Sequence, residues 1–150
     1  MNYEASIEDM RADPTLFVEG MLGAEPDEWQ TEVMAAVAAG NRGISIRSGH
    51  GAGKTSCLSW LALWWIGTHY HAKVVITAPT SAQLHDALLP EAKSWLKQSP
   101  PGFRDLFNVK SDRIELIADP ERNFISAKTS RAEQPDALLG VNADHVLLIC

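Results

Sequence analysis

The feature that most restricts the fold of this chain is a run of small residues that ends in lysine and threonine, Ser48 to Thr55 (SGHGAGKT). The β-branched segment GISIR (43–47) precedes it and predicts a strand, whereas the long apolar segment after it predicts a helix from Lys54 to Tyr70. A strand, a glycine-rich turn and a helix in this order are typical of a phosphate-binding loop. The small residues let backbone N–H groups turn toward phosphate oxygens, and the start of the helix adds partial positive charge.

The chemistry expected of such a loop assigns roles to its residues. Lys54 would reach the β- and γ-phosphates of a nucleotide, and the hydroxyl of Thr55 would bind Mg²⁺. Ser48 stands where the usual pattern has glycine, and His50 either points at the phosphates or faces solvent. Arg47, just before the loop, is interpreted as a surface residue. The residues predicted to bind the nucleotide here are Ser48, Gly49, His50, Gly51, Ala52, Gly53, Lys54, Thr55 and Ser56.

A second candidate for nucleotide binding is Gln30, which follows Trp29 upstream of the first predicted strand. A glutamine amide can pair with both the N6 donor and the N7 acceptor of adenine. The alternative is an exposed position on a helix that Pro26 opens and Gly40 ends. The position of Gln30 ahead of a phosphate loop favours adenine recognition.

The order of the remaining elements predicts an α/β fold with a mainly parallel sheet flanked by helices. Pro90 is expected to kink or break a helix that begins at Thr80 or Ser81 and runs to about Lys97. The other predictions are two short N-terminal helices, a buried strand at 73–79, a loop at 99–105, a hairpin of strands at 112–118 and 123–130, a short helix or loop at 133–140, and a second buried strand at 145–150.

The distribution of charge bears on the possible ligands and on the domain organisation of the chain. The net charge is −6 over 150 residues, but residues 1–40 hold nine acids and one arginine and therefore carry −8. The rest carries +2, so charge neither requires nor excludes nucleic acid as a ligand. We predict an acidic helical arm over 1–25 and a partial P-loop ATPase domain over 26–150.

Several other classes of protein are disfavoured. Cys57 and Cys150 have no metal-ligand spacing, which favours a reducing compartment. The N-terminal residues show no secretory pattern, and the longest apolar run, 57–66, is too short to span a bilayer. A cytoplasmic location without membrane contact is expected.

Taken together, the motifs resemble one family, the large terminase subunits of tailed bacteriophages, over roughly residues 26–150. The resemblance lies in Trp29-Gln30, in RSGHGAGKT (47–55), in VVITAPTSAQL (74–84) and in LLGVNADHVLLIC (138–150). It implies an additional-strand P-loop ATPase fold related to RecA and the helicases, with ATP and Mg²⁺ as cofactors. It also implies double-stranded DNA, a portal protein and a small terminase subunit as partners, and a homo-oligomer in the full motor.

The resemblance also implies roles for single residues. Lys54 would act in catalysis, and Val146 to Cys150 would form the Walker B strand, which two acids follow in the family. The chain ends at Cys150 and Asp144 is poorly placed to replace those acids, so we expect nucleotide binding with very slow hydrolysis. His50 occupies a place where many terminases carry an arginine. Arg131 is the candidate substitute, with a plain surface charge as its alternative.

Two other functions stay open at this point. A helicase-like or recombination ATPase would share the fold and the phosphate loop. A degenerate prophage remnant would bind a nucleotide or a partner without hydrolysing ATP.

Overall fold

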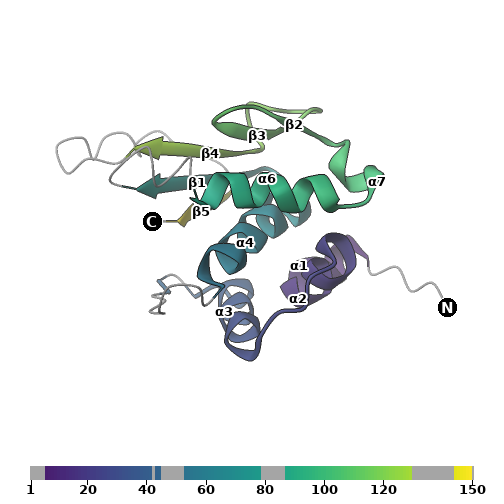
Figure 1. The fold of residues 1–150 in the computed structure, drawn as a ribbon, viewed down its shortest axis with the longest axis vertical. Coiled ribbons are helices and arrows are strands. Elements are labelled where there is room, and N and C mark those ends of the chain that lie inside the picture. The colour runs from purple at the N-terminus through teal and green to yellow at the C-terminus, as the bar shows by residue number, and fades with distance from the viewer. Residues whose placement is uncertain (1–5, 42, 45–52, 79–86, 130–143, 150) are drawn as a thin grey trace.

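The chain folds into a five-stranded sheet with helices packed in layers beneath it (Figure 1). The computed structural model describes residues 6–41, 43–44, 53–78, 87–129 and 144–149. Its strands are β1 (Ala72–Ala78), β2 (Phe107–Val109), β3 (Arg113–Leu116), β4 (Phe124–Thr129) and β5 (His145–Ile149). Its helices are α1 (Ile7–Ala12), α2 (Pro14–Phe17), the π-helical η1 (Val18–Leu22), α3 (Glu28–Ala38), α4 (Lys54–Thr68), α6 (Leu89–Gln98) and α7 (Pro101–Arg104).

The strands run in the order β2-β3-β4-β1-β5. β1 pairs in parallel with β4 on one side and with β5 on the other, and Val75 lies level with Ser126 and Leu148. β3 is antiparallel to both β4 and β2, so it alone of the described strands runs in the opposite direction. The predicted α/β class and the hairpin at 112–130 are therefore confirmed.

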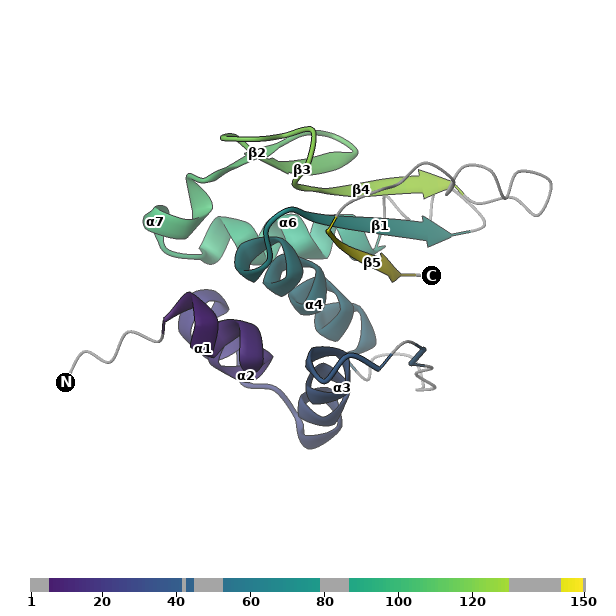
Figure 2. The ribbon, with the colours of Figure 1, turned by 180° about the vertical axis from the view of Figure 1, so that it is seen from behind.

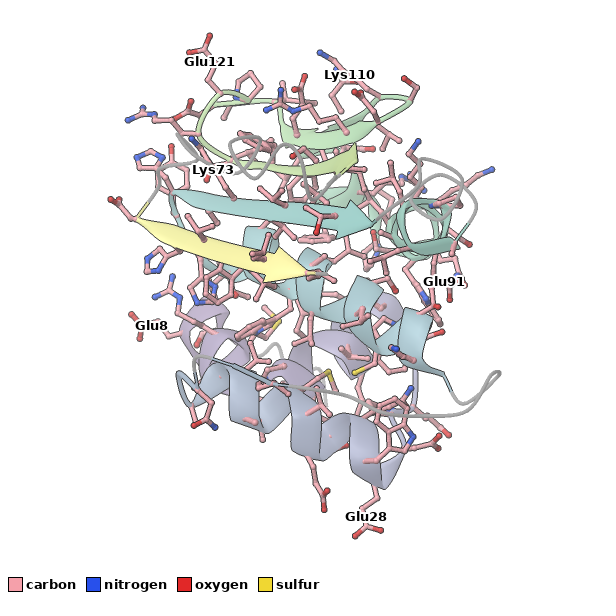
Figure 3. All side chains as sticks on the ribbon, turned by 90° about the vertical axis from the view of Figure 1, so that its left-hand side faces the viewer. Glu8, Glu28, Lys73, Glu91, Lys110 and Glu121 are labelled. Atoms are coloured by element: carbon pink, nitrogen blue, oxygen red, sulfur yellow. The ribbon has the colours of Figure 1, made fainter. Side chains whose placement is uncertain are left out.

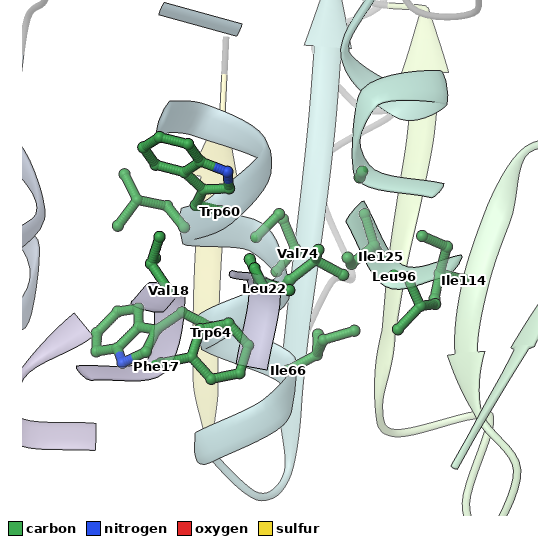
Figure 4. Close-up of a cluster of buried hydrophobic side chains, with 14 of the residues drawn as sticks. Phe17, Val18, Leu22, Trp60, Trp64, Ile66, Val74, Leu96, Ile114 and Ile125 are labelled. Atoms are coloured by element: carbon green, nitrogen blue, oxygen red, sulfur yellow. The ribbon is translucent and has the colours of Figure 1, made fainter. Parts of the chain in front are cut away.

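Helix α4 lies at the centre of the molecule, between the sheet and the layer formed by α1, α2 and α3 (Figure 2). Nine of its 15 residues are buried, which explains why its sequence is apolar on nearly every side. Trp64 is 1% exposed, and its indole Nε1–H donates a 2.7 Å hydrogen bond to the carbonyl oxygen of Met10. Figure 4 shows Trp60 and Trp64 of this helix in one cluster with Phe17 and Val74.

The acidic segment predicted as an N-terminal arm packs into this same core. A capping box between Ser6 and Asp9 starts α1, and Met10, Phe17 and Leu22 are buried against α4. Acidic side chains such as that of Glu8 stay exposed (Figure 3). The arm therefore contributes apolar area to the fold while its charges remain in water.

Some local predictions were wrong. The predicted loop at 99–105 contains the short helix α7, which begins at Pro101, and the strand β2 was not foreseen. α3 begins at Glu28 after an Asp27 cap, so Pro26 precedes the helix instead of opening it. Pro90 lies in the first turn of α6, where a missing N–H costs no intrahelical hydrogen bond.

Among the described helices, none combines the length and the apolar character needed to cross a lipid bilayer.

Histidine rings gather where α4 passes into β1. The ring of His69 stacks on Trp65 at 4.2 Å between centroids and lies 4.9 Å from the ring of His145. Arg11 donates a hydrogen bond to the carbonyl oxygen of the adjacent Thr68. Burial, together with the nearby charges of His145 and Arg11, lowers the pKa of His69 to about 4.

This pKa predicts a loss of stability in acid. Folding favours neutral His69, so its contribution is complete above the unfolded pKa of 6.5 and disappears as the pH falls toward 4. Because His69 is partly exposed, we expect this to lower the free energy of unfolding by only about 1 kcal/mol. Urea unfolding at pH 7 and pH 4.5 measures the loss, and His69→Gln should reduce it. If the free energy of unfolding depended equally on pH in the parent and in His69→Gln, the loss of stability in acid could not be assigned to His69.

Candidate nucleotide-binding site

The site starts where the predicted phosphate loop enters α4. Gly53 caps the helix in the left-handed conformation, with φ of 80°, and no side chain caps the free backbone N–H groups. Lys54 and Thr55 follow with exposed side chains, and the first turn contains no acidic residue. Lys54 forms no ion pair with any of the described residues. This turn therefore presents partial and full positive charge to solvent, as binding of an anion requires.

Gly53 is held in place by Gln30 from α3. The Nε2–H of Gln30 donates a 2.9 Å hydrogen bond to the carbonyl oxygen of Gly53. A Cβ on Gly53 would come within 2.7 Å of that Nε2 atom, so any larger residue would collide with the amide as well as strain the backbone. The structure thus brings together two residues that the sequence placed in one site from distant positions.

The amide of Gln30 also caps its own helix. Its Oε1 accepts a 2.8 Å hydrogen bond from the backbone N–H of Asp27, and the side chain is only 4% exposed. The alternative of an exposed helix position is therefore excluded for Gln30. Each atom of the amide retains one further hydrogen-bonding position, because the nitrogen has two hydrogens and the oxygen has two lone pairs. Adenine recognition by Gln30 remains a prediction.

Glu91 is a residue of this region that the sequence did not reveal. Its Oε1 accepts a 2.8 Å hydrogen bond from the hydroxyl of Ser56, in the first turn of α4, and a 3.1 Å bond from the indole Nε1–H of Trp95. In the sequence Glu91 was only an acid beside the kink expected at Pro90, and the structure places it in the first turn of α6, where acids are common. Nothing in the spacing showed that α6 begins beside α4.

The site lies at the carboxyl-terminal edge of the parallel strands. β1 and β4 end on the side of the sheet where α4 and α6 begin (Figure 2). In open α/β sheets, ligands bind in the crevice at this edge. The position of the phosphate-loop helix therefore agrees with the usual geometry of a nucleotide site.

Asp144 lies at the opposite edge. It directly precedes β5 and is exposed at the amino-terminal end of a strand that runs parallel to β1. Its carboxylate is therefore far along the strand from the edge where α4 begins, which agrees with the expectation that it cannot replace the acids of a Walker B strand.

Cys57 and the histidines that the structure describes play no visible part in this site. Burial raises the pKa of the Cys57 thiol to about 11, so the thiol stays protonated within the core at neutral pH. In the part of the chain that the structure describes, no three His, Cys, Asp or Glu side chains come together as metal ligands.

The remaining predicted site residues fall outside the described residues. They are Ser48, Gly49, His50, Gly51, Ala52 and Arg131, together with Thr80, Ser81 and most of the predicted strand at 43–47.

The structure shows a mixed α/β sheet with an exposed, lysine-bearing helix start at its carboxyl edge, which is where α/β proteins commonly bind anionic ligands. Comparison with known proteins finds a relative. The chain is 26% identical over 132 residues to a protein described as "Probable terminase, large subunit" from Enterobacteria phage P7. The match covers 86% of this chain but only 27% of that protein. No family model matches the chain.

Proposed function

We propose that this chain is the ATP-binding part of a P-loop ATPase that drives the packaging of double-stranded DNA in a bacteriophage. The observation that supports this most is the start of α4, where Lys54 and Thr55 are exposed after the left-handed Gly53. The similarity to a probable terminase large subunit favours DNA packaging over the other uses of a phosphate loop.

In this proposal, the loop from Ser48 to Gly53 surrounds the phosphates with backbone N–H groups. Lys54 contacts the β- and γ-phosphates, and Thr55 supplies a hydroxyl ligand for Mg²⁺. When bound, the metal neutralises charge on the phosphate oxygens. The described residues fit this role, because the turn has an uncapped helix start, an exposed lysine, an exposed hydroxyl and no acid among its own residues.

The same proposal implies the partners and the location of the motor. The DNA-packaging partners would be a portal protein and a small terminase subunit, and the full motor would be a homo-oligomer in the host cytoplasm. Hydrolysis would require the two acids that follow the Walker B strand in the family, because such acids position the attacking water.

The direct test is calorimetric titration of the purified chain with ATP, in the presence of Mg²⁺ and in excess EDTA. We expect saturable binding that weakens when the metal is removed, because uncompensated phosphate charge raises the cost of binding. A chain with native circular dichroism that binds no ATP under either condition would contradict the proposed function.

Adenine recognition is tested separately with Gln30→Ala. If Gln30 recognises the base, the variant should lose about tenfold in ATP affinity and less in GTP affinity, since the loss of two base hydrogen bonds affects adenine alone. The measurement is the ratio of the two dissociation constants. An unchanged ratio, with both nucleotides weakened equally, would mean that Gln30 acts only by holding Gly53.

A further inference from the structure

A carboxylate joins the phosphate-loop helix to the helix beside it. Glu91 lies in the first turn of α6, half-buried, and accepts hydrogen bonds from Ser56 at 2.8 Å and from Trp95 at 3.1 Å. Figure 3 shows Glu91 on the same side of the molecule as the start of α4, whereas Glu121 lies on the far side of the sheet. An acid in a first turn commonly serves only its own helix dipole, but this carboxylate is bonded to the neighbouring helix.

The packing around this contact fixes its geometry. Trp95, which shares the same carboxylate oxygen, meets Trp60 of α4 edge to face with 5.7 Å between ring centroids. Trp60 is 4% exposed, so the aromatic pair forms part of the buried contact between α4 and α6. The polar contact between Ser56 and Glu91 is therefore joined, through the shared carboxylate oxygen and Trp95, to a packed aromatic contact between the same two helices.

We propose that Glu91 is a positioning residue of the nucleotide site, which holds the first turn of α4 against α6 through Ser56. This inference rests on the proposed function, because Ser56 directly follows Lys54 and Thr55 in the turn that would carry the phosphates. Glu91 acts on a neutral hydroxyl, so it fixes the turn without pairing with Lys54. Through the same contact, a nucleotide bound at the phosphate loop affects the position of α6.

Two consequences distinguish this role from a general structural one. Removal of either partner should release the turn, so Ser56→Ala and Glu91→Ala should each weaken ATP binding, and the double variant should be no weaker than one of them. Because Trp95 shares the carboxylate, ATP should also change its fluorescence. That change should disappear in Trp95→Phe, and Glu91→Ala should reduce it.

The experiment measures ATP affinity in Mg²⁺ by calorimetry for the parent chain, the two single variants, the double variant and Glu91→Gln. We expect about a tenfold loss for each single variant, as for one hydrogen bond to a charged group. Glu91→Gln should retain most of the affinity, because its amide oxygen accepts the same two bonds. Glu121→Ala, which removes an exposed acid from the turn before β4, is the matched control and should bind ATP like the parent.

Several results would overturn the inference while leaving the proposed function intact. They are full parental affinity in both single variants, additive losses in the double variant, or lowered melting temperatures without any change in affinity. In all of these cases Lys54→Ala would still abolish binding. If the parent chain itself bound no ATP, the proposed function and this inference would both fail.

Discussion

Lys54→Ala should remove ATP binding by this chain, with a loss of affinity on the order of 100-fold, since an ammonium on the β- and γ-phosphates makes two charge-assisted hydrogen bonds. The substitution should lower the ATP affinity without lowering the stability of the fold. Lys54 is exposed at the start of α4, so the free energy of unfolding should change little. Calorimetry with ATP and Mg²⁺ measures the first quantity, and urea unfolding measures the second.

The matched control is Lys97→Ala. Lys97 is also exposed and also lies in a terminal turn of a helix, but in the last turn of α6. Both variants change the net charge by the same amount, so nonspecific attraction between the protein and ATP changes equally. Equal ATP affinity in the parent and in Lys54→Ala would show that the proposed phosphate loop does not bind ATP.

Trp64→Ala should have the largest effect on stability, a loss of about 4 kcal/mol in the free energy of unfolding, because a large cavity opens in the core. Trp64 is 1% exposed and bonds to the carbonyl oxygen of Met10, so the variant also leaves a buried acceptor without its donor. Chemical denaturation followed by far-UV circular dichroism measures the change.

Two further variants serve as comparisons for the loss of stability in Trp64→Ala. Trp64→Phe keeps most of the ring but loses the hydrogen bond to Met10, so it should cost less than the alanine variant. Tyr70→Ala removes an aromatic ring that is 58% exposed and should change stability by less than 1 kcal/mol. A stability of Trp64→Ala within 1 kcal/mol of the parent would show that the packing around α4 is looser than the structure indicates.

Much of the fold could be predicted because its strongest elements have strong local signals. The apolar helix after Lys54 and the β-branched runs of β1 and β5 were found within one or two residues of their observed limits. The continuous apolar runs of α4 and β1 agree with their burial on several sides. The predicted burial of the last strand was wrong, because β5 lies at the edge of the described sheet with Val146 and Leu148 exposed. The short β2 strand and the single turn of α7 have no such signal, because their conformation depends on packing against α6 and β3.

In the candidate site too, some residues could be predicted from local sequence signals and others could not. The phosphate-loop motif identified Gly53, Lys54 and Thr55, because the chemistry requires those residue types in consecutive positions. Gln30 was identified from the chemistry of its amide and from its position ahead of the phosphate loop, but its contact with Gly53 could not be read from a spacing of 23 residues. Glu91 was missed because its partner Ser56 lies 35 residues away, and only the packing of α6 on α4 brings the two together.

The position of β1 within the sheet also has a consequence for how the chain folds. β1 pairs with β4 and β5, both of which follow it at long range in the sequence. Such pairings form slowly, because a long loop must close before any contact is gained. During synthesis, α4 and β1 leave the ribosome well before β5, so part of their apolar surface has no partner until the last residues of β5 are made. Until β4 and β5 are made, both edges of this interior strand remain unpaired.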